Sequence, residues 1–281
     1  MDTGKSIRWR RFRSSPSGHA LVVPIDHGLT LGPIPGVSSV SDMARWITHP
    51  AITGIVAHKG VVERLAARGL LAGVGVMVHL NGMSALSPTP NRKEMLTTVE
   101  SAVRLGADAV SLQLNFDEAN DAHNLSMLGA VVDAAQTFGL PVLTMLYDKV
   151  ESPSAEAGRV RLRHLMRITI ELGTDAIKIG PRANVAEIGP LLSGISEDVD
   201  VLFAGGELGS DGDVIALAKA ATAAGAAGLC VGRNTFQREA PGEMLSKLQI
   251  AMRGMPRVAV ARNGARELLS LRSDSSPRAV G

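Results

Sequence analysis

Four segments of the sequence repeat one pattern, in which a helix-like stretch ends in a glycine and leads through a short loop into an apolar strand. They read RLGADAVSL (104–112), TFGLPVLTM (137–145), ELGTDAIKI (171–179) and AAGAAGLCV (223–231). Strands that are apolar along their whole length are buried on both faces, as in parallel sheets whose strands are joined by right-handed helical crossovers. The glycine suits the C-cap of the preceding helix. The pattern therefore predicts repeated strand–helix units.

Eight apolar runs alternate with such helix-like stretches. The runs lie near residues 21–25, 53–57, 74–78, 108–114, 141–146, 175–179, 199–203 and 227–231, and the stretches include KEMLTTVESAVRLG, LSMLGAVVDAAQTFG, RVRLRHLMRITIELG and DVIALAKAATAAG. Eight units in about 250 residues predict an α/β fold, the (β/α)8 TIM barrel. An open doubly wound sheet is the alternative, but no G-x-G-x-x-G opens a helix after the first run. We expect residues 1–272 to form a single barrel domain with a basic N-terminal arm, and residues 273–281 to be a disordered tail.

Composition narrows the function classes. The 281 residues carry 29 Lys and Arg against 27 Asp and Glu, and a net charge of +2 does not indicate a nucleic-acid partner. The single cysteine, Cys230, cannot form an internal disulfide, which favours a cytoplasmic protein. RWRRFR followed by ALVVPI resembles a twin-arginine signal, but its apolar segment is too short, and no apolar run is long enough to cross a membrane. We expect the following basic residues to form a solvated or interface-forming arm: Lys5, Arg8, Arg10, Arg11 and Arg13.

Active sites of this barrel lie at the C-terminal ends of its strands, so the residues that end each apolar run are the candidates. They are Asp26 and His27, His58 and Lys59, His79, Asn115, Tyr147, Lys178, Gly205 and Gly206, and Gly232 and Arg233.

Lys178 lies inside the apolar strand DAIKI. A buried ammonium is costly unless it is paired or gives up its proton, and burial lowers the pKa of the amine toward a form that attacks carbonyls. The alternative is a structural lysine inside the barrel. Asp26 fits its ion-pair partner and equally fits a proton-transfer group. Tyr147, the only tyrosine, ends the neighbouring strand, where it is either a rim residue or the acid/base that a Schiff base requires.

Glycines follow the last two strands, Gly205 and Gly206 in FAGGELGSDGD and Gly232 in CVGRNTFQ. Barrels often bind phosphate there through backbone N–H groups, and the guanidinium of Arg233 can add paired hydrogen bonds to phosphate oxygens. A tight structural turn explains one glycine pair by itself, but two such turns with an arginine favour a phosphate site. We place His27 in the same substrate-binding set.

Histidines end three consecutive strands, namely His27, His58 and His79. Imidazole is a common zinc ligand, which makes a metal site an alternative. Three rings would have to point at one position, however, and hydrogen-bonded rim histidines are the commoner case. We expect no metal.

Several segments together resemble a known family: LVVPIDHGLTLGPIPG, AHKG, VHLNGMSALSPTPN, TTVESAVRLGADAVSLQLN, GTDAIKI, FAGG and AAGLCVGRNTFQ. They are similar to the Schiff-base-forming barrel aldolases of the archaeal class I fructose-bisphosphate aldolase type. Within that family they most resemble the branch of 2-amino-3,7-dideoxy-D-threo-hept-6-ulosonate synthases and of aldolases that join dihydroxyacetone phosphate to aspartate semialdehyde. The resemblance implies that Lys178 is the Schiff-base lysine, Tyr147 the proton-donating tyrosine and Asp26 the aspartate of the D-H-G motif.

The resemblance also implies a reaction. It indicates a class I aldolase or transaldolase acting between a phosphorylated ketose donor such as dihydroxyacetone phosphate and an aldehyde such as aspartate semialdehyde, without a cofactor and in a homo-oligomer. Some segments depart from the family: Gln113 stands where a histidine is expected, and HLNGMS, DKVESPSAEAG and IGPRAN differ from their counterparts. The chemistry is thus better supported than the substrate. A thiolase using coenzyme A on a phosphorylated dione, a metal-dependent aldolase and a non-catalytic sugar-phosphate-binding barrel remain alternatives.

Overall fold

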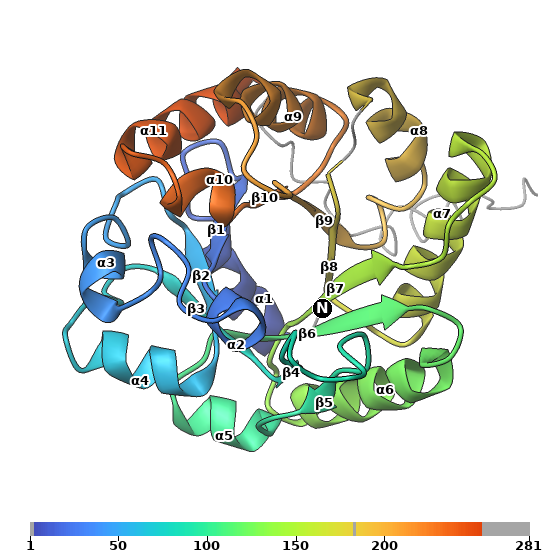
Figure 1. The fold of residues 1–281 in the computed structure, drawn as a ribbon, viewed down its shortest axis with the longest axis horizontal. Helices are drawn as coiled ribbons and strands as arrows, with labels where there is room; N and C mark the ends of the chain where they lie inside the picture. Colours follow the sequence, from blue (N-terminus) through green and yellow to red (C-terminus); the bar gives the residue numbers. More distant parts are fainter. Residues whose placement is uncertain (1–2, 182–183, 255–281) are drawn as a thin grey trace, which may run out of the picture.

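The computed structural model describes residues 3–181 and 184–254, and within them eight parallel strands close into a barrel (Figure 1). In ring order they are β1 (Ala20–Pro24), β2 (Gly54–Ala57), β3 (Gly75–His79), β6 (Ala109–Phe116), β7 (Val142–Asp148), β8 (Ala176–Ile179), β9 (Asp200–Ala204) and β10 (Gly228–Cys230), which pairs with β1. Each predicted run overlaps one of these strands. The predicted barrel is confirmed, and the open sheet is excluded because the ring closes. The predicted tail and the end of the predicted domain lie outside the described residues.

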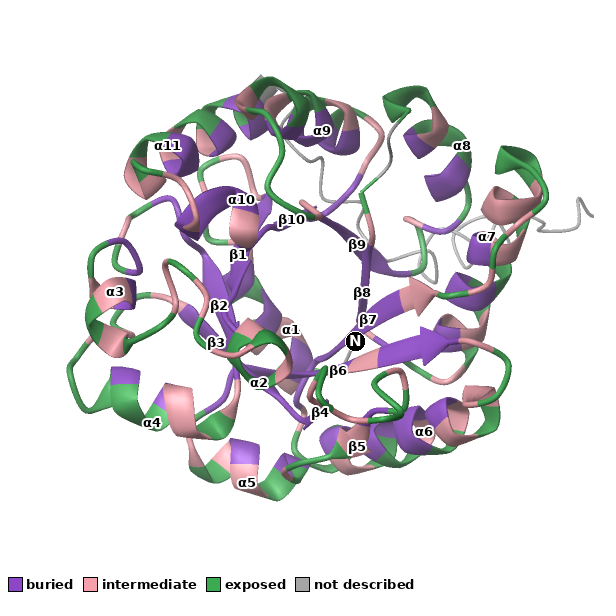
Figure 2. Ribbon diagram, in the orientation of Figure 1, coloured by how far each residue is buried: buried purple, intermediate pink, exposed green. Residues whose placement is uncertain are grey.

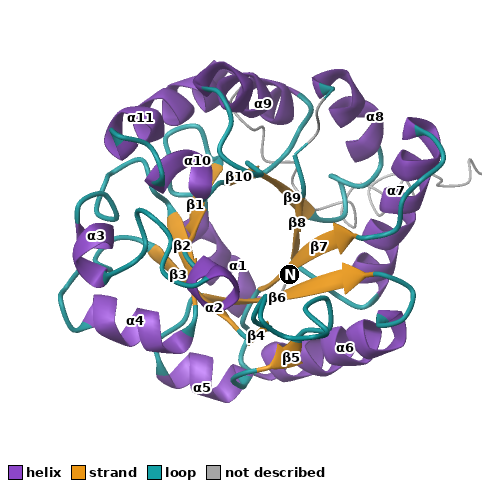
Figure 3. Ribbon diagram, in the orientation of Figure 1, coloured by secondary structure: helices purple, strands orange, loops and turns teal. Residues whose placement is uncertain are grey.

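Helices surround the ring of strands (Figure 3). They are α2 (His27–Leu31), α3 (Val40–Ala44), α4 (Lys59–Ala66), α5 (Val99–Arg104), α6 (Asp121–Thr137), α7 (Ala155–Glu171), α8 (Ile188–Leu192), α9 (Asp211–Ala223), α10 (Arg233–Phe236) and α11 (Pro241–Ala251), with short 3-10 turns η1 (Val185–Glu187) and η2 (Met252–Gly254). The glycines predicted as helix ends adopt the left-handed conformation, with φ of +80° at Gly106 and +92° at Gly173. No helix of the two described ranges is both long and apolar enough to cross a membrane.

One predicted helix is shorter than its sequence suggests. In KEMLTTVESAVRLG only Val99–Arg104 is helical, because the side chain of Thr98 accepts a hydrogen bond from Ser101 N and caps the helix there. The residues before the cap include β5 (Glu94–Met95), which pairs antiparallel with β4 (Asn81–Gly82). The segment between β3 and α5 therefore forms a loop with its own two-stranded ribbon, placed after β3 at the strand's C-terminal end.

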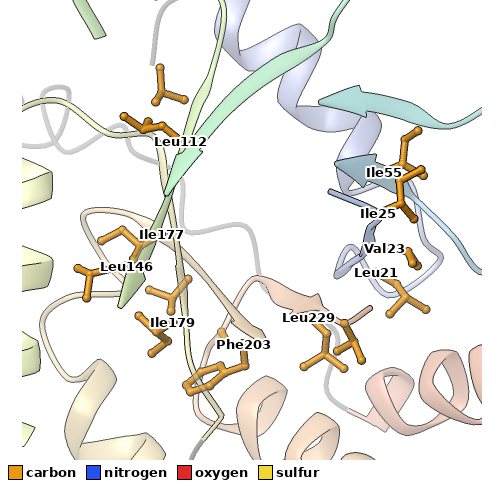
Figure 4. Packing of buried hydrophobic residues seen from close by; sticks show 14 of the residues in the cluster. Leu21, Val23, Ile25, Ile55, Leu112, Leu146, Ile177, Ile179, Phe203 and Leu229 are labelled. Carbon is orange, nitrogen blue, oxygen red and sulfur yellow. The ribbon is translucent and has the colours of Figure 1, made fainter. Parts of the chain in front are cut away.

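Alternation along the strands divides the core into two layers. Side chains such as Leu21, Ile55 and Ile177 point outward and pack beneath the helices (Figure 4). The intervening residues, such as Val22, Met77 and Ala176, point inward and fill the barrel. Figure 2 shows the strands buried and the exposed surface confined largely to the outer sides of the helices and to loops. A polar residue on an inward position is therefore held inside the barrel.

The basic N-terminal arm is a helix, α1 (Thr3–Phe12), that lies across the N-terminal end of the barrel, behind the ring of strands in Figure 1. Trp9 and Phe12 join the inner layer, and Trp9 Nε1 donates a hydrogen bond of 2.7 Å to Asp200. The expected solvated arm was wrong for Lys5, which is buried, and for Arg8 and Arg13, which are partly buried. Lys5 pairs with Asp175, Arg11 with Asp108 and Arg13 with Asp200, and Arg8 donates to Gly139 O. These three aspartates lie at the N-terminal ends of strands, where buried carboxylates require cationic partners. Arg10 and Arg11 are exposed as expected.

Candidate active site

Lys178 lies on the inner face of β8 and is 5% exposed. Its Nζ lies 3.7 Å from Met145 Sδ and interacts electrostatically with Cys230. Burial acts to lower the pKa of Lys178, as the sequence predicted, but Cys230, Tyr147 and Asp26 together outweigh burial, and the pKa is raised. The predicted direction was wrong because charged and polar groups from other strands converge on the amine. In the free protein Lys178 is an ammonium.

Asp26 follows β1 and lies at the barrel mouth with a side chain that is 14% exposed. Its Oδ1 lies 3.6 Å from His27 Nδ1, and its Oδ2 lies 3.7 Å from His79 Nε2. Burial raises the pKa of Asp26, but His79, His27, Lys178 and His58 outweigh this and lower it to about 2. Asp26 is therefore an anion that interacts electrostatically with Lys178 across the barrel.

Tyr147 lies on the inner face of β7. Met145 pairs in register with Lys178, so Tyr147 stands two residues nearer the C-terminal end of the barrel on the same face. Its half-buried ring packs against the inner layer, and Lys149 Nζ lies 5.5 Å from the ring centroid. The structure thus brings Lys178, Asp26 and Tyr147 to one region of the barrel mouth.

The three histidines surround Asp26. His79 is 2% exposed, its Nδ1 lies 2.8 Å from Ser111 Oγ, and its ring stands edge to face against His58 at 5.2 Å. Burial lowers the pKa of His79 to about 3 although Asp26 opposes it, and burial also lowers the pKa values of His27 and His58. All three rings are neutral at physiological pH. In residues 3–181 and 184–254, no group of three or more His, Cys, Asp or Glu side chains has the arrangement of a metal site.

The predicted phosphate-binding glycines follow β9 and β10, of which β10 is next to β1 in the ring, and Asn234 fixes the loop after β9. Its buried Nδ2 donates to the carbonyls of Gly205 (2.9 Å) and Glu207 (2.7 Å), and its Oδ1 accepts from Gly209 N (2.9 Å). Gly206 has a φ of +74°, which favours glycine. A Cβ on Gly205 would lie 2.7 Å from Val231 Cγ1. Protein packing alone therefore requires glycine at both positions, and this wall of the site is preformed.

Arg233 completes this wall. Its Nη1 lies 3.6 Å from Glu207 Oε1, whereas its Nε is buried and has no hydrogen-bond partner in the structure. His27 Nδ1 is likewise buried without one, and its ring lies so close to Gly232 that a Cβ there would be 2.8 Å from His27 Cε1. Buried donors without acceptors are rare and indicate a missing partner. The structure brings together all five residues predicted to bind phosphate or substrate.

Sequence reasoning missed three residues of the site. Cys230, considered only for disulfides, lies near Lys178 as a neutral thiol, because burial raises its pKa to about 11. The alternation of GLCV could have placed it inside the barrel, since Leu229 points outward. Asn234 follows Arg233 directly, but its role depends on the loop after β9. Lys93 lies in the segment that was expected to be helical, and no local signal marked it.

Comparisons with known proteins identify the family. A model of the DeoC/LacD family aldolases matches residues 20–238. The 2-amino-3,7-dideoxy-D-threo-hept-6-ulosonate synthase 1 of Archaeoglobus fulgidus is 31% identical over 249 residues, covering 88% of this chain and 91% of that protein. The 2-amino-4,5-dihydroxy-6-oxo-7-(phosphonooxy)heptanoate synthase of Streptomyces griseus is 30% identical over 251 residues, covering 87% and 88%.

Solved structures show the same fold. An archaeal fructose-1,6-bisphosphate aldolase with its catalytic lysine bound to a carbinolamine intermediate superposes with a TM-score of 0.77 at 24% identity, covering 89% of this chain and all of that one. The family resemblance seen in the sequence is confirmed, and so is the prediction of a lyase-type enzyme. The chain belongs to the DeoC/LacD family of aldolases.

Proposed function

We propose that this protein is a class I aldolase in which Lys178 forms a Schiff base with a phosphorylated ketone. The observation that carries the proposal is the buried amine on the inner face of β8, with Asp26 and Tyr147 beside it and no salt-bridged carboxylate within 4 Å of it in the described residues. A purely structural barrel lysine would be ion-paired at short range. Lys178 instead faces the mouth beside an anion, Asp26, and a proton-transfer group, Tyr147.

The residues divide the chemistry among them. The ammonium of Lys178 first gives up its proton to solvent, and the resulting amine attacks the ketone carbon. The carbinolamine then loses water, and the iminium withdraws electrons so that the adjacent C–H or C–C bond breaks to an enamine. Tyr147 is placed to donate and accept the protons of these steps. Asp26, ionised because its pKa is about 2, stabilises first the ammonium and then the iminium. Hydrolysis returns the lysine, so the cycle needs no cofactor.

The donor phosphate binds, in this proposal, at the wall formed by Gly205, Gly206, Gly232, Arg233 and His27. The buried Nε of Arg233 supports this placement, because a phosphate oxygen supplies the acceptor that the protein does not. The helix that follows, α10, has only four residues, so the loop backbone and the guanidinium supply most of the attraction.

The names of the relatives indicate the substrates. The Streptomyces product carries hydroxyls at carbons 4 and 5, a ketone at carbon 6 and a phosphonooxy group at carbon 7. An aldol bond joins the carbon next to a ketone to a hydroxyl-bearing carbon, which here is the bond between carbons 4 and 5. Cleavage there gives dihydroxyacetone phosphate and aspartate semialdehyde. We propose this pair, or close analogues, as donor and acceptor.

Borohydride reduction tests the proposal. We expect dihydroxyacetone phosphate plus borohydride to inactivate the enzyme and leave one adduct on Lys178, found by peptide mass mapping, and we expect Lys178→Met to form none. An adduct on Lys59, Lys93 or Lys149 instead would overturn the assignment. Activity that resists borohydride but is lost to a chelator, or that requires coenzyme A, would support the metal-dependent or thiolase alternative.

A further inference from the structure

Lys93 is a second buried lysine at the barrel mouth. It lies in the loop between β4 and β5 and is 4% exposed. Its Nζ makes one long hydrogen bond of 3.5 Å, to Met83 O. Within the described part of the chain, no carboxylate lies within 4 Å of this ammonium. Burying an unpaired ammonium costs several kcal/mol, so its position requires a reason other than packing.

The loop that carries Lys93 is held in place by side chains from the barrel and from α6. Asn115 Nδ2, at the end of β6, donates 2.9 Å to Asn91 O, and His123 Nε2, on α6, lies 2.9 Å from Lys93 O. Asn81 exchanges hydrogen bonds of 2.8 Å and 2.7 Å with the backbone of Gln113. The backbone at Lys93 is therefore anchored on both sides, and the buried position of its side chain is built in.

The charges around Lys93 place it at the edge of the active site. Burial lowers its pKa, Lys149 adds repulsion, and Asp26 is the carboxylate that opposes them. Lys93 in turn acts on the buried ring of His79. Among the described residues, Asp26 is the carboxylate that interacts with both Lys178 and Lys93, so these two ammonium groups share one anion. The site lacks one negative charge.

The order of the strands around the barrel indicates where a negatively charged group of the substrate would bind. The loop of Lys93 follows β3 and is fastened to β6, whereas the proposed phosphate wall follows β9 and β10. In the closed ring β3 lies opposite β9 and β6 lies opposite β10, as Figure 1 shows. Lys178 on β8 stands between the two walls. A substrate whose phosphate occupies one wall thus extends past Lys178 toward Lys93.

We propose that Lys93 binds the carboxylate of the aldehyde acceptor and so selects acidic aldehydes. The proposal rests on the proposed aldolase function and adds the acceptor's recognition group to it. A carboxylate suits one buried ammonium, whereas phosphate is usually held by several donors, as on the opposite wall. The exposed Lys149 adds long-range attraction but is not enclosed.

Acceptor kinetics of Lys93→Met test the site. We expect the KM for aspartate semialdehyde to rise roughly ten- to a hundredfold, as for loss of a charged hydrogen bond. The KM for dihydroxyacetone phosphate, borohydride trapping on Lys178 and turnover with propanal, which has no carboxylate, should stay unchanged. Lys93→Arg should restore part of the preference for the acidic acceptor. Lys149→Met is the matched control, with a smaller effect that high salt removes.

Four results would overturn the acceptor site. Equal loss with propanal and aspartate semialdehyde, in Lys93→Met or in the milder Lys93→Gln, would show a structural role; thermal unfolding identifies a folding defect. Loss of trapping in Lys93→Met would place Lys93 in the donor chemistry. If the unsubstituted enzyme itself forms no Lys178 adduct, the proposed function fails and the acceptor site with it. If the unsubstituted enzyme forms a normal Lys178 adduct but shows no preference for acidic acceptors, only the acceptor site is refuted.

Discussion

Asp26 Oδ2 lies 3.7 Å from Nε2 of His79, yet the histidine remains uncharged. Burial lowers the pKa of His79 to about 3, against an ordinary value of 6.5, even with the carboxylate beside it. The pair therefore has the charge of Asp26 alone, which leaves that charge available to Lys178 and Lys93.

The neutrality of His79 predicts acid instability. Between pH 6.5 and 3 the unfolded chain binds a proton at this histidine and the folded protein does not, so the free energy of unfolding falls as the pH drops through that range, by about 1.4 kcal/mol per pH unit for this group. His79→Gln should reduce this slope by about 1.4 kcal/mol per pH unit, the contribution of one proton. Urea unfolding at pH 7.5, 6 and 5 measures it. The exposed His164→Gln should leave the slope unchanged, and a wild-type slope in His79→Gln would refute the prediction.

Asp26→Asn should lower the pKa of Lys178, because the substitution removes an anion that stabilises the ammonium. More of the amine is then neutral at a given pH. Trapping by cyanoborohydride with dihydroxyacetone phosphate should therefore persist to lower pH than in the wild type, although turnover falls. Trapping rates measured from pH 5 to 9 decide this. A shift toward higher pH would mean that Asp26 acts mainly as a base for the amine.

Tyr147→Phe separates proton transfer from amine chemistry. The ring keeps its packing and loses only the O–H, so the free energy of unfolding should change by about 1 kcal/mol or less. Turnover should fall about a hundredfold to ten-thousandfold, the usual contribution of a general acid/base. Borohydride should still trap the donor on Lys178. Wild-type turnover in the folded variant would make Tyr147 a rim residue.

Arg233→Ala should raise the KM for dihydroxyacetone phosphate far more than the KM for the aldehyde, because the guanidinium faces the proposed phosphate wall. Gly206→Asp should act in the same direction but is less informative, because Gly206 has a φ of +74° and a Cβ there would lie 2.9 Å from Pro181 Cγ. Steady-state kinetics with both substrates varied gives the comparison. Arg104→Ala, exposed on α5, is the control. Equal changes in both KM values would argue against phosphate binding here.

Gly54→Ala should destabilise the protein by about 1–3 kcal/mol, because the added Cβ would overlap the ring of Phe12. Phe12→Leu in the same chain should recover part of the loss, giving a non-additive double-mutant cycle in thermal unfolding. Gly129→Ala on α6, where a Cβ meets nothing within 4 Å, should be neutral or stabilising. Additive changes in stability would show that Gly54 and Phe12 do not interact.

The barrel was predictable because its signals are local. Apolar runs mark strands that are buried on both faces, and left-handed glycines such as Gly106 and Gly173 mark helix ends. Lys178 and Tyr147 were recognisable because strand ends define the active-site face.

The remaining features depend on residues distant in the chain. Lys93 was missed because Asn115 and His123 determine the path of its loop. The pKa of Lys178 was misjudged because Cys230 and Asp26 reach it from other strands. Alternation within one strand can predict that a side chain points inward, but it cannot predict which charges it meets.

The N-terminal helix α1, which packs Trp9 and Phe12 into the barrel, also constrains the order of folding. α1 precedes every strand in the chain, but Lys5 bonds to a residue 170 positions later and Trp9 to one 191 positions later. Contacts of such long sequence separation form late, after the loops between them have closed. During synthesis α1 therefore cannot complete these two contacts until Asp175, which precedes β8, and Asp200, in β9, have emerged. When α1 docks, it covers the N-terminal end of the barrel.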